Sequence, residues 1–377
     1  MKIGIVFDDS LDRPDGVQQY IKNIGGWLTT QGHEVHYLVG ETKTTEFAHT
    51  HSLSRNVNVS YNGNQLSIPL PANRGVIKRL LAQEQFDILH VMMPYSPMMA
   101  AKVIRYAPSR TAVIGTFHIL PQTSLVRWST HLLGWWLRRN LRRFDKIVAV
   151  SPAAQRFAES AFSVRDVSVL PNVVSSAEFA EAAGFEKYGD TIPTIVFLGR
   201  LVQRKGCSTL VDAIAEVKKS GLWPVRLVIC GKGPEDAALR AQVERLGIGE
   251  AVEFTGFISE ADKPRYLSSA DIAVFPSLGG ESFGIVLLEA MAAAQPVVLA
   301  ASNPGYASVM EPQPAQMFAP GDSHALALLI QKYIQDEAAA AAAQQWQESY
   351  ISQFDVSVVG ARLVAEYSVQ LQKRRAS

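Results

Sequence analysis

The sequence has little cysteine, no long apolar run and no leader-like start. Its two cysteines, Cys207 and Cys230, exclude a disulfide framework and indicate a reducing compartment. The longest weakly charged stretch, residues 283–301, is interrupted by a glutamate and a proline, so no membrane-spanning helix is predicted. Two aspartates directly follow the apolar residues 1–7, which is unlike a signal peptide. We therefore expect a cytoplasmic protein.

An excess of one charge is also missing, since the 377 residues carry a formal net charge of only +1. Residues 1–172 nevertheless contain 19 Lys and Arg against 12 Asp and Glu, and the remainder contains 17 against 23. The basic first half favours an anionic partner, although a solvated basic face is the alternative for any charge cluster. The length exceeds one ordinary core, and the composition, 47% hydrophobic and 19% charged, is typical of globular proteins, so we expect two domains.

The most informative stretch is a glycine-rich loop between a strand predicted at residues 272–275 and a helix predicted at residues 283–293. Gly279, Gly280 and Gly284 allow a tight turn and leave room for a ligand to approach the backbone N–H groups at the positive end of the helix. An anion such as phosphate is expected there.

Two carboxylates, Glu281 and Glu289, flank the start of this helix. Carboxylates would repel phosphate, so their expected targets are hydroxyl groups, which donate hydrogen bonds to them. Either glutamate alone is explained as an acid at a helix start, but the pair in this loop favours binding. Phosphate together with hydroxyls indicates a nucleotide sugar.

The run Gly-Gly-Glu-Ser-Phe-Gly-Ile-Val at residues 279–286, followed by Glu-Ala-Met-Ala-Ala at residues 289–293, resembles the paired-glutamate signature of family 4 of the retaining glycosyltransferases. It is most similar to that of the bacterial phosphatidyl-myo-inositol mannosyltransferases. The resemblance implies the α/β fold called GT-B, in which two Rossmann-like, doubly wound domains face each other across a cleft and the C-terminal helix crosses back to the first domain.

This fold places the domains along the chain. Residues 1–172, together with a terminal helix at about residues 357–377, would form the acceptor-binding domain. Residues 173–190, rich in Ala, Glu and Gly, would be the linker, and residues 191–356 would form the nucleotide-sugar-binding domain.

Two cations, Arg200 and Lys205, lie five residues apart at the end of a strand predicted at residues 194–198. Such a pair can neutralise a diphosphate leaving group without a metal ion. Their spacing resembles the Gly-Arg and Lys-Gly motif of the family, which favours Lys205 over the neighbouring Arg204. We therefore expect neither a metal nor a cofactor other than the donor.

His118 follows a strand predicted at residues 112–117, and Gly-Thr-Phe-His resembles a family motif. A packed histidine is the ordinary explanation for one residue of this kind, but the carboxyl edge of a doubly wound sheet is where its ligands bind. The resemblance implies that His118 holds a sugar hydroxyl and is not the general base. Gly16 would belong to the N-terminal glycine loop of the family, with Asp15 standing where the first glycine is usual.

The resemblance thus gives three sets of site residues. The catalytic set is Arg200, Lys205, Glu281 and His118. The donor-binding set is Gly16, Gly231, Lys263, Gly279, Gly280, Ser282, Phe283, Gly284, Ile285 and Glu289. The acceptor-binding set is Asp12 and Gln18.

Residues 125–146 combine three tryptophans with six cations and one acid. A basic helix with tryptophans is suited to a membrane surface, because the rings reach headgroup depth and the cations meet anionic lipid. The alternative is a helix packed against its own domain; no nucleic-acid motif accompanies the cluster, so we expect no nucleic-acid partner. The membrane candidates are Trp128, Trp135, Trp136, Arg138, Arg139, Arg142 and Arg143.

The resemblance implies transfer of mannose from GDP-mannose, with retention, to a lipid headgroup such as phosphatidylinositol, by a peripheral protein at the inner, cytoplasmic face of the membrane. The first alternative is a soluble glycosyltransferase with a UDP-sugar donor and a non-lipid acceptor, because Gln122 and Thr123 lie where the lipid enzymes tend to carry a lysine. Two further alternatives are a sugar-nucleotide epimerase and a regulatory nucleotide-sugar-binding protein without turnover.

Overall fold

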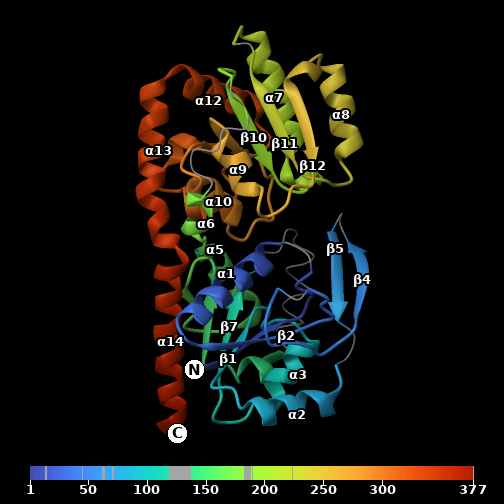
Figure 1. The fold of residues 1–377 in the computed structure, drawn as a ribbon, viewed down its shortest axis with the longest axis vertical. Helices are drawn as coiled ribbons and strands as arrows, with labels where there is room; N and C mark the ends of the chain where they lie inside the picture. Colours follow the sequence, from blue (N-terminus) through green and yellow to red (C-terminus); the bar gives the residue numbers. More distant parts are fainter. Residues whose placement is uncertain are drawn as a thin grey trace. The chain divides into compact units, whose positions relative to one another are not determined.

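The computed structural model describes residues 1–12, 15–44, 46–61, 64–69, 72–118, 137–181, 188, 190–222 and 224–376 (Figure 1). They form two compact units. The N-terminal unit consists of Met1–Val173 and Val356–Ser377, and the C-terminal unit consists of Val174–Asp355. Each unit contains one parallel sheet with helices around it.

The sheet of the N-terminal unit has the order β3-β2-β1-β6-β7-β8-β9, and its strands pair in parallel. These strands are β1 (Lys2–Phe7), β2 (Glu34–Val39), β3 (Thr50–Ser52), β6 (Ile88–Val91), β7 (Ala112–Phe117), β8 (Lys146–Ala149) and β9 (Ser168–Val169). An antiparallel hairpin, β4 (Asn56–Tyr61) and β5 (Asn64–Pro69), forms a separate small sheet. The buried strands are almost continuously apolar, as expected of a parallel sheet covered on both faces.

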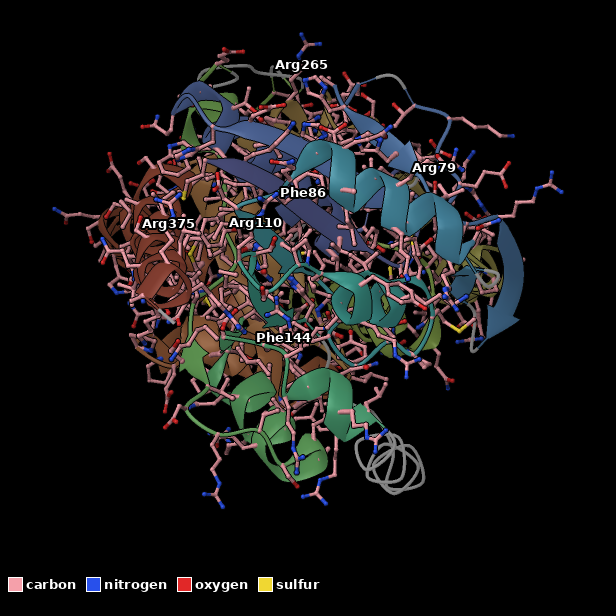
Figure 2. All side chains as sticks on the ribbon, turned by 90° about the horizontal axis from the view of Figure 1, so that it is seen from below. Arg79, Phe86, Arg110, Phe144, Arg265 and Arg375 are labelled. Carbon is pink, nitrogen blue, oxygen red and sulfur yellow. The ribbon has the colours of Figure 1, made fainter. Side chains whose placement is uncertain are left out.

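The helices of this unit whose bounds lie entirely within the described residues are α1 (Gly16–Thr30), α2 (Arg74–Glu84), α3 (Met99–Tyr106), α5 (Pro152–Phe162) and α14 (Val356–Ala376). Figure 2 shows Phe86, just after α2, inside the unit and Arg375 at its surface near the end of α14. The predicted basic helix at residues 125–146 is wrong at its C-terminal end. Helix ends at residue 141, and Lys146 already belongs to β8, because the apolar residues after it pair with β7.

The C-terminal helix α14 belongs to the N-terminal unit, as the fold prediction requires. The Tyr367 hydroxyl lies 2.6 Å from His90 Nδ1 in the buried interior, and Arg374 Nε donates to Asp145 Oδ1 at 2.7 Å. α14 also packs against α1 at Gly360, where an added Cβ would lie 2.5 Å from the ring of Trp27. A side chain at this position would therefore separate the two helices.

The sheet of the C-terminal unit has the order β12-β11-β10-β13-β14-β15, again parallel. Its strands are β10 (Thr194–Leu198), β11 (Arg226–Cys230), β12 (Val252–Gly256), β13 (Ile272–Phe275), β14 (Val297–Ala301) and β15 (Met317–Phe318). Its α-helices are α6 (Ser176–Ala180), α7 (Cys207–Lys219), α8 (Asp236–Arg245), α9 (Lys263–Ser268), α10 (Ile285–Ala292), α11 (Pro304–Met310), α12 (Ser323–Gln335) and α13 (Glu337–Ile351). Short 3₁₀ helices are η1 (Gln203–Lys205), η2 (Gly249–Ala251), η3 (Pro314–Gln316) and η4 (Ser352–Phe354).

The structure describes part of the segment expected to be a linker. Within it α6 packs on α10, and the Val174 amide donates to the Phe354 carbonyl at 3.1 Å. Among the described helices, none is both long enough and apolar enough to cross a bilayer.

Candidate active site

Two loops meet at the carboxyl edge of the C-terminal sheet. One follows β10 and the other follows β13, two strands that are neighbours in the sheet but not in the sequence. Doubly wound sheets bind ligands at such a switch point. The loops are joined through Arg204, whose carbonyl accepts from the Leu278 amide at 2.8 Å and from the Ser277 hydroxyl at 3.1 Å.

Glu281 is the centre of this meeting point. Its Oε1 accepts from Arg204 Nη1 at 2.7 Å, from Lys205 Nζ at 2.9 Å and from Ser277 Oγ at 2.8 Å. Burial disfavours the ionised carboxylate, but the charges of Lys205 and Arg204 outweigh burial and hold the pKa of Glu281 below its ordinary value. Glu281 is therefore a carboxylate that orients two cations.

Sequence reasoning placed Lys205 against a diphosphate and Glu281 against sugar hydroxyls, as separate groups. The structure brings them into direct contact and adds Arg204 and Ser277, which sequence reasoning left out of the site. The signal for Arg204 was its place beside Lys205. Arg200 begins the same loop, at the end of β10, and its side chain is exposed.

A second cluster of charged side chains joins α9 to α10. Glu289 is buried there, and its Oε1 accepts from Lys263 Nζ at 2.7 Å; Lys263 also pairs with Glu260 at 2.6 Å. Burial raises the pKa of Glu289, and the Lys263 ammonium offsets only part of that effect. Burial works against the charge of Lys263, but the two carboxylates raise its pKa, so the ammonium persists. Both residues were predicted as donor contacts, but their mutual ion pair was not.

The glycine loop has the backbone that its sequence predicts at two positions. Gly280 has φ 74° and Gly284 φ 110°, values that glycine adopts far more readily than other residues. Gly284 is the N-cap residue of α10 and has no side chain with which to cap the helix itself.

Two of the predicted donor contacts have clear structural roles in the unit. The Phe283 side chain is buried against Phe354, with ring centroids 6.0 Å apart, so it points into the core and not toward a ligand. At Gly231 an added Cβ would lie 1.9 Å from the Gly199 carbonyl, so this glycine is required for the loops after β10 and β11 to pack. Ser282 and Gly279 lie in the loop, half-buried, and Ile285 opens α10.

The N-terminal unit has its own group of polar side chains, His118 at the end of β7 and Gln18 on α1. His118 is 8% exposed, and burial lowers its pKa to about 3, so the ring is neutral. Among the described residues, His118 Nε2 and Gln18 Oε1 have no hydrogen-bond partner although both are buried. Buried polar atoms normally have partners, so each of these two atoms could hydrogen-bond to a hydroxyl of a ligand.

In the loop after β1, the acidic side chains mainly accept hydrogen bonds from nearby backbone amides. Asp15 Oδ1 accepts from the Val17 and Gln18 amides at 2.9 and 3.0 Å, so the acid that replaces the expected first glycine caps α1. Asp12 accepts from the Lys43 and Thr44 amides at 2.8 and 2.7 Å. Asp12, predicted as an acceptor contact, therefore stabilises the conformation of this loop. Gly16, the first residue of α1, has open space where a side chain would be.

Two family models match the chain, Glycosyltransferase Family 4 over residues 14–178 and Glycosyl transferases group 1 over residues 183–350. The chain is also 30% identical over 376 residues to the phosphatidyl-myo-inositol mannosyltransferase of Mycobacterium leprae (strain TN), an alignment that covers 97% of this chain and 96% of that protein. The chain belongs to glycosyltransferase family 4. The predicted family is confirmed, and a nucleotide-sugar donor with a glycosyl acceptor fits it.

Solved structures confirm the fold of this glycosyltransferase as GT-B. The sucrose-phosphate synthase of Thermosynechococcus elongatus matches with a TM-score of 0.79 at 20% identity, covering 100% of both chains. The Anabaena HepE protein in complex with UDP and glucose matches with a TM-score of 0.75 at 20% identity, covering 98% of this chain and 99% of that one.

The basic segment of the glycosyltransferase divides into two parts. Trp128, Trp135 and Trp136 lie outside the described residues. Among the arginines, Arg143 differs from the expectation of a lipid contact, because it donates to the Pro108 and Thr111 carbonyls, both at 2.8 Å, and lies 3.5 Å from Asp145. It stabilises the fold.

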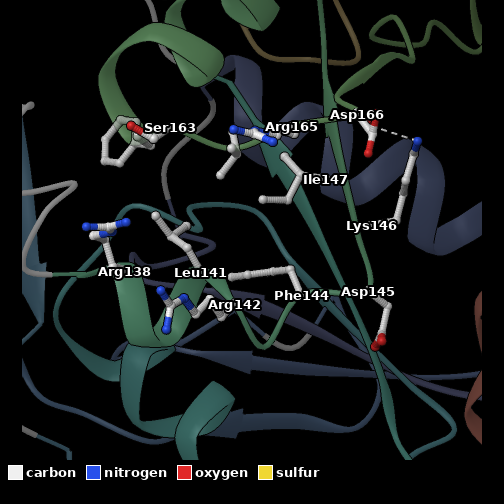
Figure 3. Close-up of a pocket in the computed structure, with 12 residues that line it drawn as sticks. Arg138, Leu141, Arg142, Phe144, Asp145, Lys146, Ile147, Ser163, Arg165 and Asp166 are labelled. Carbon is white, nitrogen blue, oxygen red and sulfur yellow. Dashed lines mark hydrogen bonds between the residues drawn. The ribbon is translucent and has the colours of Figure 1, made fainter. Parts of the chain in front are cut away.

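Arg138, Arg139 and Arg142 are exposed, as a surface contact requires. Figure 3 shows Arg138 and Arg142 beside a cavity of about 300 Å³, whose other cations are Arg165 and Lys146. Its apolar lining is Leu141, Phe144, Ile147, Phe162 and Val164, and the carboxylates Asp145 and Asp166 line it as well. The cavity therefore combines cations, carboxylates and apolar side chains.

Asp8 gives the enzyme a pH-dependent stability. Burial raises its pKa to about 6, against hydrogen bonds from Ser96 Oγ and, at 2.8 Å, from the Ala100 amide. The unfolded chain loses this proton near pH 4 and the folded one near pH 6. Stability should therefore fall by up to about 3 kcal/mol as the pH rises from about 4 to about 6. Urea unfolding of Asp8→Asn should lack that decline, and equal pH slopes in both proteins would contradict it.

Proposed function

We propose that the enzyme transfers mannose from GDP-mannose to the inositol headgroup of phosphatidylinositol, with retention of configuration, at the cytoplasmic face of the membrane. The observation that carries the proposal is the likeness over nearly the whole chain to a phosphatidyl-myo-inositol mannosyltransferase, combined with the Arg204–Lys205–Glu281 cluster.

The donor would bind to the C-terminal unit. Its diphosphate suits the N–H groups before α10 and the cations Arg200 and Lys205, while Glu281 holds Lys205 in place through their 2.9 Å contact. These fixed charges can stabilise the leaving diphosphate without a metal, so the proposal includes neither a metal nor a cofactor besides the nucleotide sugar. Glu289 lies on α10 and Lys263 pairs with it from α9; these two residues would contact other groups of the donor.

For the chemical step we propose attack on the face from which the leaving group departs. The bond between the anomeric carbon and the phosphate oxygen breaks first, giving an oxocarbenium-like ion. The acceptor hydroxyl oxygen then bonds to the same face of that carbon, and its proton passes to the departing phosphate oxygen. The neutral His118 ring and Gln18 would hold hydroxyls in the N-terminal unit, and His118 would not serve as a base because its pKa is about 3.

The acceptor would be drawn from an anionic membrane by exposed cations. Each Lys or Arg near such a surface contributes about 1 kcal/mol to binding. Replacing Arg138, Arg139 and Arg142 by Gln should therefore weaken binding to phosphatidylinositol-containing vesicles by about 100-fold. A control with the same charge change, Lys219, Arg240 and Arg245 to Gln in the C-terminal unit, should bind as the wild type does.

Vesicle co-sedimentation and transfer of radiolabelled mannose to vesicle lipid test this together. The proposal expects labelled lipid with the wild type and its control, and less with the arginine variant. If no label enters lipid while sugar is transferred to a soluble acceptor, the lipid acceptor is wrong and the glycosyltransferase stands.

A second candidate is a soluble glycosyltransferase with a UDP-sugar donor and a non-lipid acceptor. It is favoured by the fold's likeness to a protein solved with UDP and glucose, and by Gln122 and Thr123, which lie outside the described residues. Turnover of UDP-glucose without a response to vesicles would support it.

A further inference from the structure

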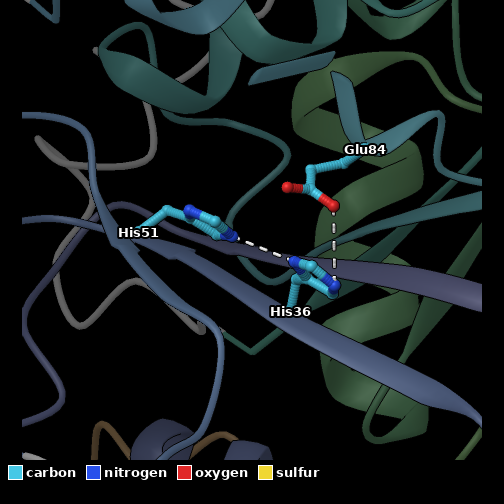
Figure 4. A group of neighbouring side chains, drawn as sticks. All are labelled: His36, His51 and Glu84. Carbon is cyan, nitrogen blue, oxygen red and sulfur yellow. Dashed lines mark hydrogen bonds and ion pairs between the residues drawn. The ribbon is translucent and has the colours of Figure 1, made fainter. Parts of the chain in front are cut away.

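Three side chains of metal-ligand type converge in the N-terminal unit: His36 on β2, His51 on β3 and Glu84 at the end of α2 (Figure 4). One ligand atom from each lies within 4.8 Å of the others. His36 Nδ1 is 2.9 Å from His51 Nε2, and Glu84 Oε2 is 3.9 Å from His36 Nε2. His36 is the third residue of β2 and pairs with Gly4 of β1, whereas His51 pairs with Leu38 near the carboxyl end of β2.

The His36 ring is held in a fixed orientation. It is 3% exposed, stacks on the ring of His49 with centroids 4.6 Å apart, and meets the edge of Phe86 at 5.3 Å. On the side away from His51, its Nε2 lies 3.0 Å from Glu34 Oε1. A carboxylate that accepts from one nitrogen of a histidine leaves the other nitrogen's lone pair free to bind a metal, and this arrangement recurs around zinc in proteins.

We propose that His36 Nδ1, His51 Nε2 and a Glu84 carboxylate oxygen bind a divalent transition-metal ion, with Zn²⁺ the first to be tested. Two imidazoles and one carboxylate suit Zn²⁺, which takes nitrogen at about 2.0–2.1 Å in tetrahedral sites. The ion takes the place of the His36–His51 hydrogen bond, and a water completes its coordination. Because His51 lies on β3, the edge strand of this sheet, the metal would stabilise the sheet edge by joining β3 to β2 and α2.

The Lys2 ammonium competes with the metal ion for the Glu84 carboxylate. Its Nζ lies 2.6 Å from Glu84 Oε2 and 3.0 Å from Glu34 Oε1. To bind the ion, Glu84 must leave this ammonium and turn from the Nε2 side of the His36 ring toward the Nδ1 side. The lysine therefore lowers the affinity for metal. Removing it should strengthen binding, an effect that adventitious binding at surface histidines would not show.

The test is calorimetric titration of ZnCl₂ into the untagged, chelator-treated full chain, with the visible absorption of bound Co²⁺ as a second readout. The wild type should bind one ion per chain. His51→Gln and Glu84→Gln should each weaken binding at least tenfold, and Lys2→Met should tighten it. The matched control is His324→Gln, which alters an exposed His–Glu pair, 2.9 Å between His324 Nδ1 and Glu216 Oε2, and should change nothing.

Circular dichroism verifies that each variant is folded, and Glu84→Gln keeps the test decisive if His51→Gln does not fold. Absence of one-to-one binding by the wild type would overturn the site. So would equal affinities and equal Co²⁺ spectra for the wild type and Glu84→Gln.

Discussion

Replacing Lys205 by Met is expected to lower kcat about 100- to 1000-fold while leaving the protein folded. Lys205 Nζ is held 2.9 Å from Glu281 in a loop at the sheet's switch point, where a preorganised cation can stabilise the charge that develops on a leaving diphosphate. Loss of one such group typically costs 10²–10³ in rate. The measurement is release of nucleoside diphosphate under saturating donor and acceptor.

Lys218→Met is the control for this variant. Lys218 is another lysine of the C-terminal unit with a carboxylate partner, at 2.9 Å from Glu250, and it lies on α7 away from the two loops. Its replacement should leave kcat within about twofold of the wild type, since exposed pairs contribute little. Equal kcat values for the Lys205 and Lys218 variants would remove Lys205 from the mechanism.

Gly206→Ala is expected to destabilise the C-terminal unit by at least about 3 kcal/mol, or about 10 °C in Tm. Gly206 has φ 67°, and an added Cβ would lie 2.0 Å from the Pro276 carbonyl. Alanine would thus be destabilised for two reasons: the left-handed backbone conformation, and a clash of its methyl group with the main chain of another segment. Because that contact joins the loops bearing Lys205 and Glu281, activity should also fall at temperatures where the protein is folded.

Gly221→Ala separates the two causes. Gly221 has φ 88°, but nothing lies within 4 Å of an added Cβ, so only the backbone cost of about 1–2 kcal/mol remains. Thermal unfolding of both variants should show a clearly smaller loss for Gly221→Ala, with normal activity. Similar losses for both would mean that the contact between the loops does not matter.

The sequence was sufficient to predict the elements whose pattern lies in neighbouring residues. The buried strands β7, β10 and β13 have the bounds that their apolar runs predicted, and the glycine loop leads into a helix as expected. Periodicity and glycine placement are properties of neighbouring residues, which is why they can be read without a structure. The error at residues 142–146 arose because the basic composition was interpreted as helix as far as Lys146, whereas helix ends at residue 141 and β8 begins at Lys146.

Contacts within the site could not be predicted in the same way. Lys205 and Glu281 were both chosen, but their ion pair depends on β10 and β13 becoming neighbours, which a sequence without an alignment does not specify. The pairing of Lys263 with Glu289 depends on the packing of α9 against α10. The cluster of His36, His51 and Glu84 likewise depends on three separate elements coming together.

Binding of GDP-mannose, compared with UDP-glucose and UDP-N-acetylglucosamine, tests the central claim most directly. Calorimetry on the wild type should show selective binding of GDP-mannose, with hydrolysis or transfer stimulated by phosphatidylinositol vesicles, and Lys205→Met should bind the donor but turn it over slowly. Preference for a UDP-sugar, with no response to vesicles, would contradict the proposed donor and acceptor while leaving the family and the fold unchanged.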